Sequence, residues 1–504
     1  MSSNEVEDRE SQAERDQRNT KIRISQEIIR ADLIANGNLE DSRTKENNAI
    51  YPAKTVEEDI KLRKEVVGAQ INVWKNILQE VLKKFAKVKD PRRPKSIRHK
   101  LAVLLMHALL IFVFKFGARK AINKELAKPY FHENMRELFP EFDSSPHSST
   151  VARALERVDP ANIEDIHVAM IKKLIKGKKF RRFLIQRNIP VSIDGVHKIA
   201  RDGDYQGVEW LERKIKSKSG KETQQYVAIL EANITLHNGL TLPLLSEFLY
   251  YDGNEDQSKQ DCELTGFKRI CKKLKAYFKR QNIILFLDKL YATFNVLTLI
   301  KRHGWKYMIV LPSNKLTVID GQLTANKEGW THIPNQPNYR GREQRWYWEN
   351  NVEWKGFEDL NAVTCFEKWY EVNKQMGEIE AQYSEHKWIT NIKISIKNLH
   401  ELCNLGGRKR WGIEDSNNTE KNRGYHYKHA YSYHWNGMQC FHLMMRLAHA
   451  INALSEFTKV LKRYIRKHGC SYTLALIKET LWAPILDKAW LNQQMKKSFI
   501  FTIE

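Results

Sequence analysis

The sequence predicts an α/β protein whose core is a mixed sheet of five strands with helices packed on it. Three observations lead to this prediction. At residues 189–197 the hydrophobic period changes from helical to alternating, which marks a first strand. Residues 226–236 and 241–251 alternate on either side of an Asn-Gly turn, a pattern typical of a β-hairpin. The unbroken apolar run at 283–287 indicates a strand buried on both faces.

Composition limits the partners and the compartment. The chain has 504 residues and a formal charge of +24, which favours a polyanionic partner, either nucleic acid or an anionic membrane. Six scattered cysteines without a Cys-x-x-Cys pair argue for a reducing compartment and against a structural zinc. The polar N-terminus predicts no signal peptide. The longest apolar run, 101–116, is interrupted by His107 and Lys115, so it predicts a buried helix and no membrane span.

Two regions precede the first strand. Residues 1–65 are highly charged and poor in aromatic residues, and they predict a disordered or loosely helical extension. Residues 66–188 have a helical period and include a basic, proline-containing segment at 89–100 and a Ser/Thr-capped amphipathic run at 148–157. We expect a helical DNA-binding region of helix-turn-helix style, mainly because the chain is so basic. The alternative is a helical scaffold with solvated Lys and Arg side chains.

Residues 189–312 form the first part of the predicted core. After the three meandering strands come a helix at 259–280, the strand at 283–287, a helix at 292–303 and a strand at 306–311. A meander that parallel strands extend through helical crossovers is compatible with a ribonuclease-H-like sheet.

The rest of the chain interrupts and then completes this pattern. Residues 313–385, rich in Gly, Asn and Trp, alternate in places and predict a β-rich insertion. Residues 386–435 are expected to return to the core with a helix at 408–421, and residues 436–504 to form a C-terminal helical region.

Three acids are the candidate catalytic residues. In the predicted sheet the first and fourth strands are neighbours, so Asp194 and Asp288 should lie side by side, and Glu414 should close the site from a helix. Such carboxylates can hold two Mg²⁺ or Mn²⁺ ions roughly 3.5–4 Å apart. No nucleophilic side chain is then needed, which suits a chain without a Ser/His/Asp or Cys/His motif. The alternative for Asp288 is a simple helix cap.

Arg410, Glu414 and Lys421 follow the pattern Arg-x3-Glu-x6-Lys. This pattern resembles the signature of the cut-and-paste DDE transposases of bacterial insertion sequences, in the branch with a β-rich insertion. The segments Ser-Ile-Asp-Gly around Asp194 and Phe-Leu-Asp-Lys-Leu-Tyr around Asp288 are similar to the strands that carry the family's first two acids.

The resemblance implies a ribonuclease-H-like catalytic core and a role for each matched residue. Asp194, Asp288 and Glu414 would be the catalytic metal ligands for two Mg²⁺ or Mn²⁺ ions. Arg410 and Lys421 would bind DNA phosphates near the cleaved end. It further implies double-stranded DNA as the partner, a homodimer on paired element ends, and a place in the bacterial cytoplasm at the nucleoid.

The resemblance covers roughly residues 85–450 and has one departure. The family has a Tyr where this chain has Gly407, which puts a hairpin intermediate in doubt; Trp411 or Tyr425 is a candidate replacement. Glu263 is either a further acid of the site or an acid favoured at a helix start.

The predicted function is therefore DNA transposition, by metal-dependent phosphodiester hydrolysis and strand transfer at the ends of an insertion sequence. Two alternatives stay open. One is a metal-dependent nuclease on the same fold, which cuts without joining. The other is an inactive transposase relic that only binds DNA.

Overall fold

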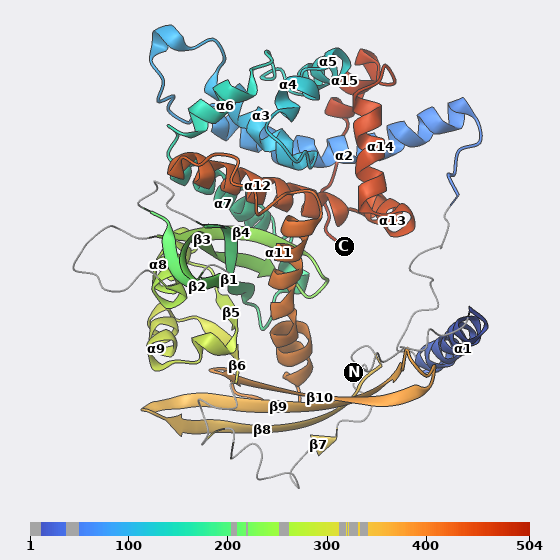
Figure 1. Cartoon of the computed structure of the whole chain (residues 1–504), viewed down its shortest axis with the longest axis vertical. Helices are drawn as coiled ribbons and strands as arrows, with labels where there is room; N and C mark the ends of the chain where they lie inside the picture. The colour runs from blue at the N-terminus through green and yellow to red at the C-terminus, as the bar shows by residue number, and fades with distance from the viewer. Residues whose placement is uncertain are drawn as a thin grey trace, which may run out of the picture. The chain divides into compact units, whose positions relative to one another are not determined.

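The computed structural model describes residues 12–36, 50–202, 209–217, 220–250, 262–311, 331–332 and 341–504, together with residues 319 and 321. It divides into two compact units (Figure 1). The larger unit comprises 44–306 and 408–504, and the smaller one comprises 1–43 and 307–407.

The larger unit contains a mixed sheet with β3 at its centre. β3 pairs antiparallel with β1 along one edge and with β2 and β4 along the other, and β1 pairs parallel with β5. The predicted meander extended by a parallel strand is therefore confirmed. β2 was not predicted, because its charged, exposed residues hide the alternation. The strands are β1 Ile189–Asp202, β2 Leu211–Ser217, β3 Gly220–Thr235, β4 Thr241–Leu249 and β5 Ile283–Leu287.

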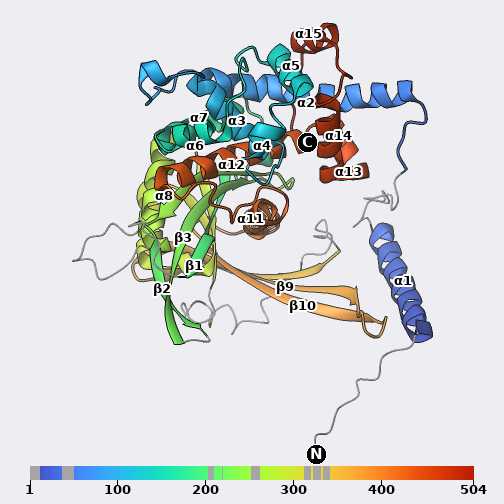
Figure 2. The same ribbon diagram turned by 45° about the horizontal axis from the view of Figure 1, so that its top comes forward.

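Helices cover both faces of this sheet (Figure 2). On one face, Val227 and Ile229 of β3 pack with Met438 of α12 (Trp435–Glu456), beside α11 (Gly412–Asn422). On the other face, Leu230 packs near Gly266 of α8 (Glu263–Tyr277). The alternation of β3 thus separates an α11/α12 face from an α8 face.

The helices before and after the sheet form one helical layer. Trp482 near the C-terminus stacks on Phe131 with ring centroids 4.0 Å apart and meets Phe114 edge-on. Every residue of α3 is buried, as its apolar sequence predicts. None of the described helices is both long and apolar enough to cross a membrane. The layer's helices are α2 Val56–Phe85, α3 Leu101–Val113, α4 Ala121–Lys124, α5 Pro129–Leu138, α6 Ser148–Leu155, α7 Pro160–Lys176, α13 Lys459–His468, α14 Cys470–Leu481 and α15 Lys488–Lys496.

The N-terminal stretch, which the sequence predicted to be disordered or loosely helical, is helical at 12–35 and from residue 56 onward. α1 spans Gln12–Ala35, and α2 begins at Val56 behind the cap Thr55. Within the smaller unit, the Ser25 hydroxyl of α1 donates to the Gly377 carbonyl at 2.7 Å. Helix-forming residues and this tertiary contact outweigh the high charge of α1. The remainder of that prediction, 1–11 and 37–49, lies outside the described residues.

The smaller unit is built on long antiparallel strands. β10 pairs with β6 and with β9, β9 pairs with β8, and β8 pairs with the short β7. This agrees with the expected β-rich insertion, although most of 312–340 lies outside the described part. Trp346 is buried in this unit, as expected of a core residue. The strands are β6 Lys306–Val310, β7 Thr331–His332, β8 Glu343–Trp354, β9 Phe357–Val372 and β10 Ile379–Thr390.

Candidate active site

The first two candidate acids lie on neighbouring parallel strands. In the pairing of β1 with β5, Ser192 is the partner of Phe286. Asp194 and Asp288 each follow two residues later, so they stand at the same level and on the same face of the sheet. The predicted neighbourhood of the first and fourth strands is therefore confirmed, with Asp194 two residues beyond Ser192 on β1 and Asp288 directly after the last residue of β5.

The third acid comes from the helix packed on that face. Glu414 lies in the first turn of α11, and Arg410 lies one turn earlier in a short 3-10 segment, Gly407–Trp411. Arg410 Nη2 and Glu414 Oε1 are 2.8 Å apart, because residues four positions apart along a helix lie on the same face. The Arg410 residue is only 6% exposed, so its guanidinium is turned inward toward the carboxylates.

These groups act electrostatically on Asp194. Burial raises the pKa of Asp194 to about 6; the Arg410 charge opposes the rise, and the Glu414 and Glu263 charges add to it. Asp194, Glu414 and Arg410 are therefore close enough in the larger unit for their charges to interact.

A glycine allows α11 to approach the sheet closely. A Cβ added at Gly412 would lie 2.8 Å from Thr241 Oγ1 and 3.4 Å from Thr235 Cγ2. Any side chain at position 412 would require either the Thr241 side chain or the first turn of α11 to shift. Since Glu414 is in that turn, Gly412 helps to set its distance from Asp194.

Glu263, the first residue of α8, is a fourth carboxyl at the site. Its carboxylate occupies the space that a side chain at position 195 would need, which explains the glycine after Asp194. Burial raises the pKa of Glu263, and the nearby charge of Asp288 raises it further. Glu263 is thus both a helix-start acid and a neighbour of the two aspartates.

The two candidate phosphate-binding residues differ in exposure. Lys421 is partly exposed near the other end of α11. Burial lowers the pKa of His197 on β1, and the charges of Arg213 and Lys421 lower it further. Arg410 is buried against Glu414. Lys421 can meet a phosphate as it stands, whereas Arg410 must first leave its carboxylate partner.

Gly407 is closely packed by neighbouring side chains. Within the smaller unit, a Cβ at this position would lie 3.0 Å from Trp388 Nε1 and 3.3 Å from Met308 Cε, so a side chain here requires these neighbours to shift by a few tenths of an ångström. Of the two candidate replacements, Tyr425 is 1% exposed and its hydroxyl accepts from Asn452, which removes it from consideration. Trp411 is 59% exposed and lies under the Arg410 guanidinium, so it is the aromatic that can stack on a base.

The donor chemistry of the site fits a hard divalent cation. Among the described residues, no three His, Cys, Asp or Glu side chains already form a metal-binding group. Asp194, Asp288 and Glu414 nevertheless offer the anionic oxygens that Mg²⁺ and Mn²⁺ prefer. Glu414 would have to turn from Arg410 to join the two aspartates.

The mixed sheet, its covering helices, and the acids on β1 and after β5 fit one class of protein, those with a ribonuclease-H-like core. Residues 258–452 match the family model described as Transposase DDE domain, and residues 82–171 match DDE_Tnp_1-associated. Together the two segments cover more than half of the 504 residues. The chain belongs to the DDE transposases of insertion-sequence type, which confirms the resemblance seen in the sequence.

The family assignment also concerns partners and cofactors. DDE transposases act on DNA and generally use divalent metal ions. Asp288, Arg410, Glu414 and Lys421 fall inside the matched segment, and Asp194 precedes it. A comparison with curated proteins finds no match.

Proposed function

We propose that this chain is an active transposase that hydrolyses phosphodiesters at the ends of an insertion sequence and joins the freed 3′-hydroxyls to target DNA. The observation that supports the proposal is that Asp194 on β1 and Asp288 just after β5 belong to adjacent parallel strands, and that the charges of Arg410 and Glu414 act on Asp194. Asp194, Asp288 and Glu414 are the proposed metal ligands.

The chain's own residues have three tasks in this reaction. Two bound divalent cations would activate the attacking oxygen and stabilise the leaving one. The three carboxylates hold and orient that site. Arg410 neutralises Glu414 until substrate arrives and then binds a phosphate with its planar fork. Lys421 adds a point charge on the same helix.

DNA binding is proposed to use further parts of the chain. The helices of residues 66–188 and the charge of +24 support backbone contacts in this region. Trp411 is proposed to stack on a base displaced near the cut. A homodimer on paired ends is proposed because each end must be cut and then joined in concert.

Cleavage of DNA that carries the element's flanking ends tests this function, with Mg²⁺ or Mn²⁺, in the native chain and in Asp288→Asn. We expect metal-dependent cleavage that disappears in the variant while DNA binding survives. Asp415→Asn, which changes an exposed acid of the same helix, is the matched control and should cut normally.

The products distinguish the alternatives. Joined products would establish strand transfer, whereas cut ends without joined products would support the nuclease. Binding without cutting under either metal would overturn the proposed activity and favour the relic.

A further inference from the structure

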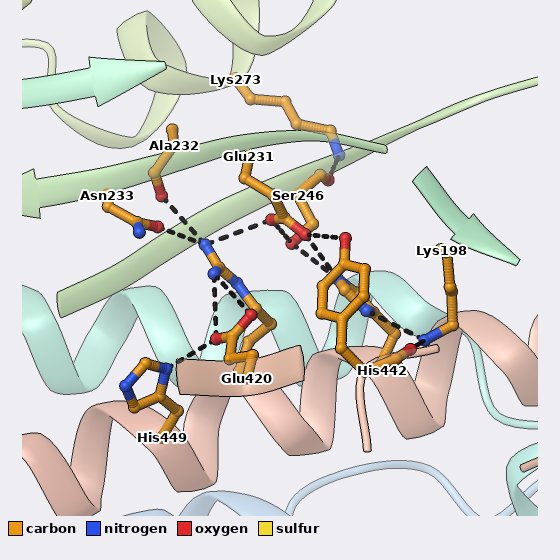
Figure 3. Close-up of polar contacts among 11 residues, drawn as sticks. Lys198, Glu231, Ala232, Asn233, Ser246, Lys273, Glu420, His442 and His449 are labelled. Carbon is orange, nitrogen blue, oxygen red and sulfur yellow. Dashed lines mark hydrogen bonds and ion pairs between the residues drawn. The ribbon is translucent and has the colours of Figure 1, made fainter. Parts of the chain in front are cut away.

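A buried charge cluster lies under α11, separate from the four acids described above (Figure 3). At its centre is Arg446 of α12, which is 1% exposed. Arg446 Nη2 is 3.2 Å from Glu231 Oε2 on β3, and Nη1 is 3.1 Å from Glu420 Oε1 on α11. Both glutamates are fully buried, and Arg446 also donates to Asn233 Oδ1. One arginine thus joins a helix of the site to the central strand of the sheet.

Each glutamate has additional partners. His449 Nδ1 lies 2.7 Å from Glu420 Oε1, and His442 Nε2 lies 2.9 Å from Glu231 Oε1 (Figure 3). The Ser246 hydroxyl donates to Glu231 Oε2 at 2.6 Å. Burial by itself would raise the pKa of both glutamates, but Arg446 and the histidines outweigh it and lower each pKa. The two carboxyls are therefore ionised at neutral pH, and both pair with the Arg446 guanidinium.

The cluster is coupled to the site through two short connections. Glu420 belongs to α11, the helix that carries Glu414 and Lys421. Glu231 is the direct cross-strand partner of Asp194 in the pairing of β1 with β3. The cluster therefore connects the helix of the third acid to the strand pair of the first acid.

The energetics favour a geometric role for these residues. A buried ion pair seldom stabilises a fold more than apolar side chains of similar volume would, because both charges lose their hydration. The ion pairs disfavour other positions of α11 on the sheet. In any other register of α11, buried charges would be left without partners.

We propose that Glu420 and Arg446 are positioning residues for the metal site. They fix α11 at one register on the sheet and so hold Glu414 beside Asp194. This inference rests on the proposed function, in which Glu414 is a metal ligand. The rival explanation is that the cluster contributes only to the stability of the fold.

Binding of Mn²⁺ to the full chain, measured by electron paramagnetic resonance without DNA, separates these explanations. We expect Glu420→Gln to weaken Mn²⁺ binding about tenfold, and Glu414→Gln to weaken it at least as much. The variant with both Glu414→Gln and Glu420→Gln should bind Mn²⁺ no more weakly than Glu414→Gln alone, because Glu420 acts through Glu414. Glu164→Gln is the matched control: Glu164 is also buried, pairs with Lys273 at 3.2 Å and belongs to α7. It should bind Mn²⁺ like the native chain.

Two results would overturn the positioning role. One is native Mn²⁺ affinity in a folded Glu420→Gln variant. The other is a double variant whose losses add, which would mean that Glu420 acts independently of Glu414. If Glu420→Gln does not fold, Mn²⁺ binding is measured instead for Glu420→Asp and Arg446→Lys, which keep the charge at each position, alone and combined with Glu414→Gln. Mn²⁺ binding that Asp194→Asn and Asp288→Asn leave unchanged would instead overturn the proposed function itself.

Discussion

Asp194 and Glu231 are direct partners in the antiparallel pairing of β1 with β3, yet the pKa values of their carboxyls shift in opposite directions. Burial raises the pKa of Asp194 to about 6, and the Arg410 charge opposes the rise. Burial also acts on Glu231, but Arg446 and His442 outweigh it and lower the pKa.

This difference separates a carboxyl of the fold from a carboxyl of the site. Glu231 has an arginine, a histidine and a serine hydroxyl within hydrogen-bonding distance. Burial and the charges of Glu414 and Glu263 outweigh the Arg410 charge at Asp194, so the negative charge of Asp194 is incompletely compensated by the protein. A cation from outside would stabilise it, which is what a metal ligand requires.

The pH dependence of stability should reveal Asp194. Its pKa rises from 3.8 when unfolded to about 6 when folded, so the folded chain binds more protons and stability falls as pH rises through this range. In EDTA, Asp194→Asn should be more stable than the native chain at pH 7.5 by about 2 kcal/mol, a value discounted for partial exposure. The advantage should shrink toward pH 4.5. Urea unfolding at both pH values measures it, and added Mn²⁺ should favour the native chain. An advantage independent of pH would contradict the assignment.

Gly412→Ala should impair both stability and cleavage. Overpacking against Thr241 lowers the free energy of unfolding by about 1–3 kcal/mol, and the better helix propensity of Ala raises it by at most about 1 kcal/mol. Cleavage should fall further than the folded fraction does, because Glu414 moves with the first turn of α11. Gly68→Ala is the control: its Cβ would lie at an ordinary 3.5 Å from Gln494 Oε1, so it should be neutral or stabilising. Equal effects of both substitutions would rule out the close approach as the cause.

Lys421→Ala should weaken DNA binding through one phosphate contact. The slope of log K against log salt should become shallower by about 1, with little change among DNA sequences. Lys421→Arg keeps the charge and should retain the native slope. Fluorescence anisotropy over a salt series provides the measurement, and an unchanged slope in Lys421→Ala would remove this residue from the interface.

Gly407→Tyr, which introduces the aromatic residue of the family pattern, should destabilise the smaller unit. The new side chain would overlap Trp388, and overpacking of this kind costs about 1–3 kcal/mol. Thermal unfolding should show a lower unfolding temperature for Gly407→Tyr. The variant with both Gly407→Tyr and Trp388→Ala should regain part of the lost stability. A stable single variant with increased cleavage would mean that Trp388 can move aside for a functional tyrosine.

The local sequence predicted most strands of the core. Alternation and apolar runs predicted β1, β3, β4 and β5 at nearly their observed positions, because a strand's burial pattern depends on its own residues. The acids after the two parallel strands, Asp194 and Asp288, were found by the same reasoning. β2 was not predicted because its outward residues are charged. Composition left residues 1–65 as either disordered or loosely helical, and it did not predict where α1 begins and ends.

Other features depend on residues far apart in the chain. By itself, the sequence determined the order of the core strands and helices and the identity of the candidate acids, since both follow from short-range patterns. Only the tertiary structure decided that Arg410 is buried against Glu414, that Glu263 joins the site, and that Arg446 links Glu231 to Glu420. These outcomes are set by desolvation and charge pairing between elements, and no local pattern encodes which distant side chain will neutralise a buried charge.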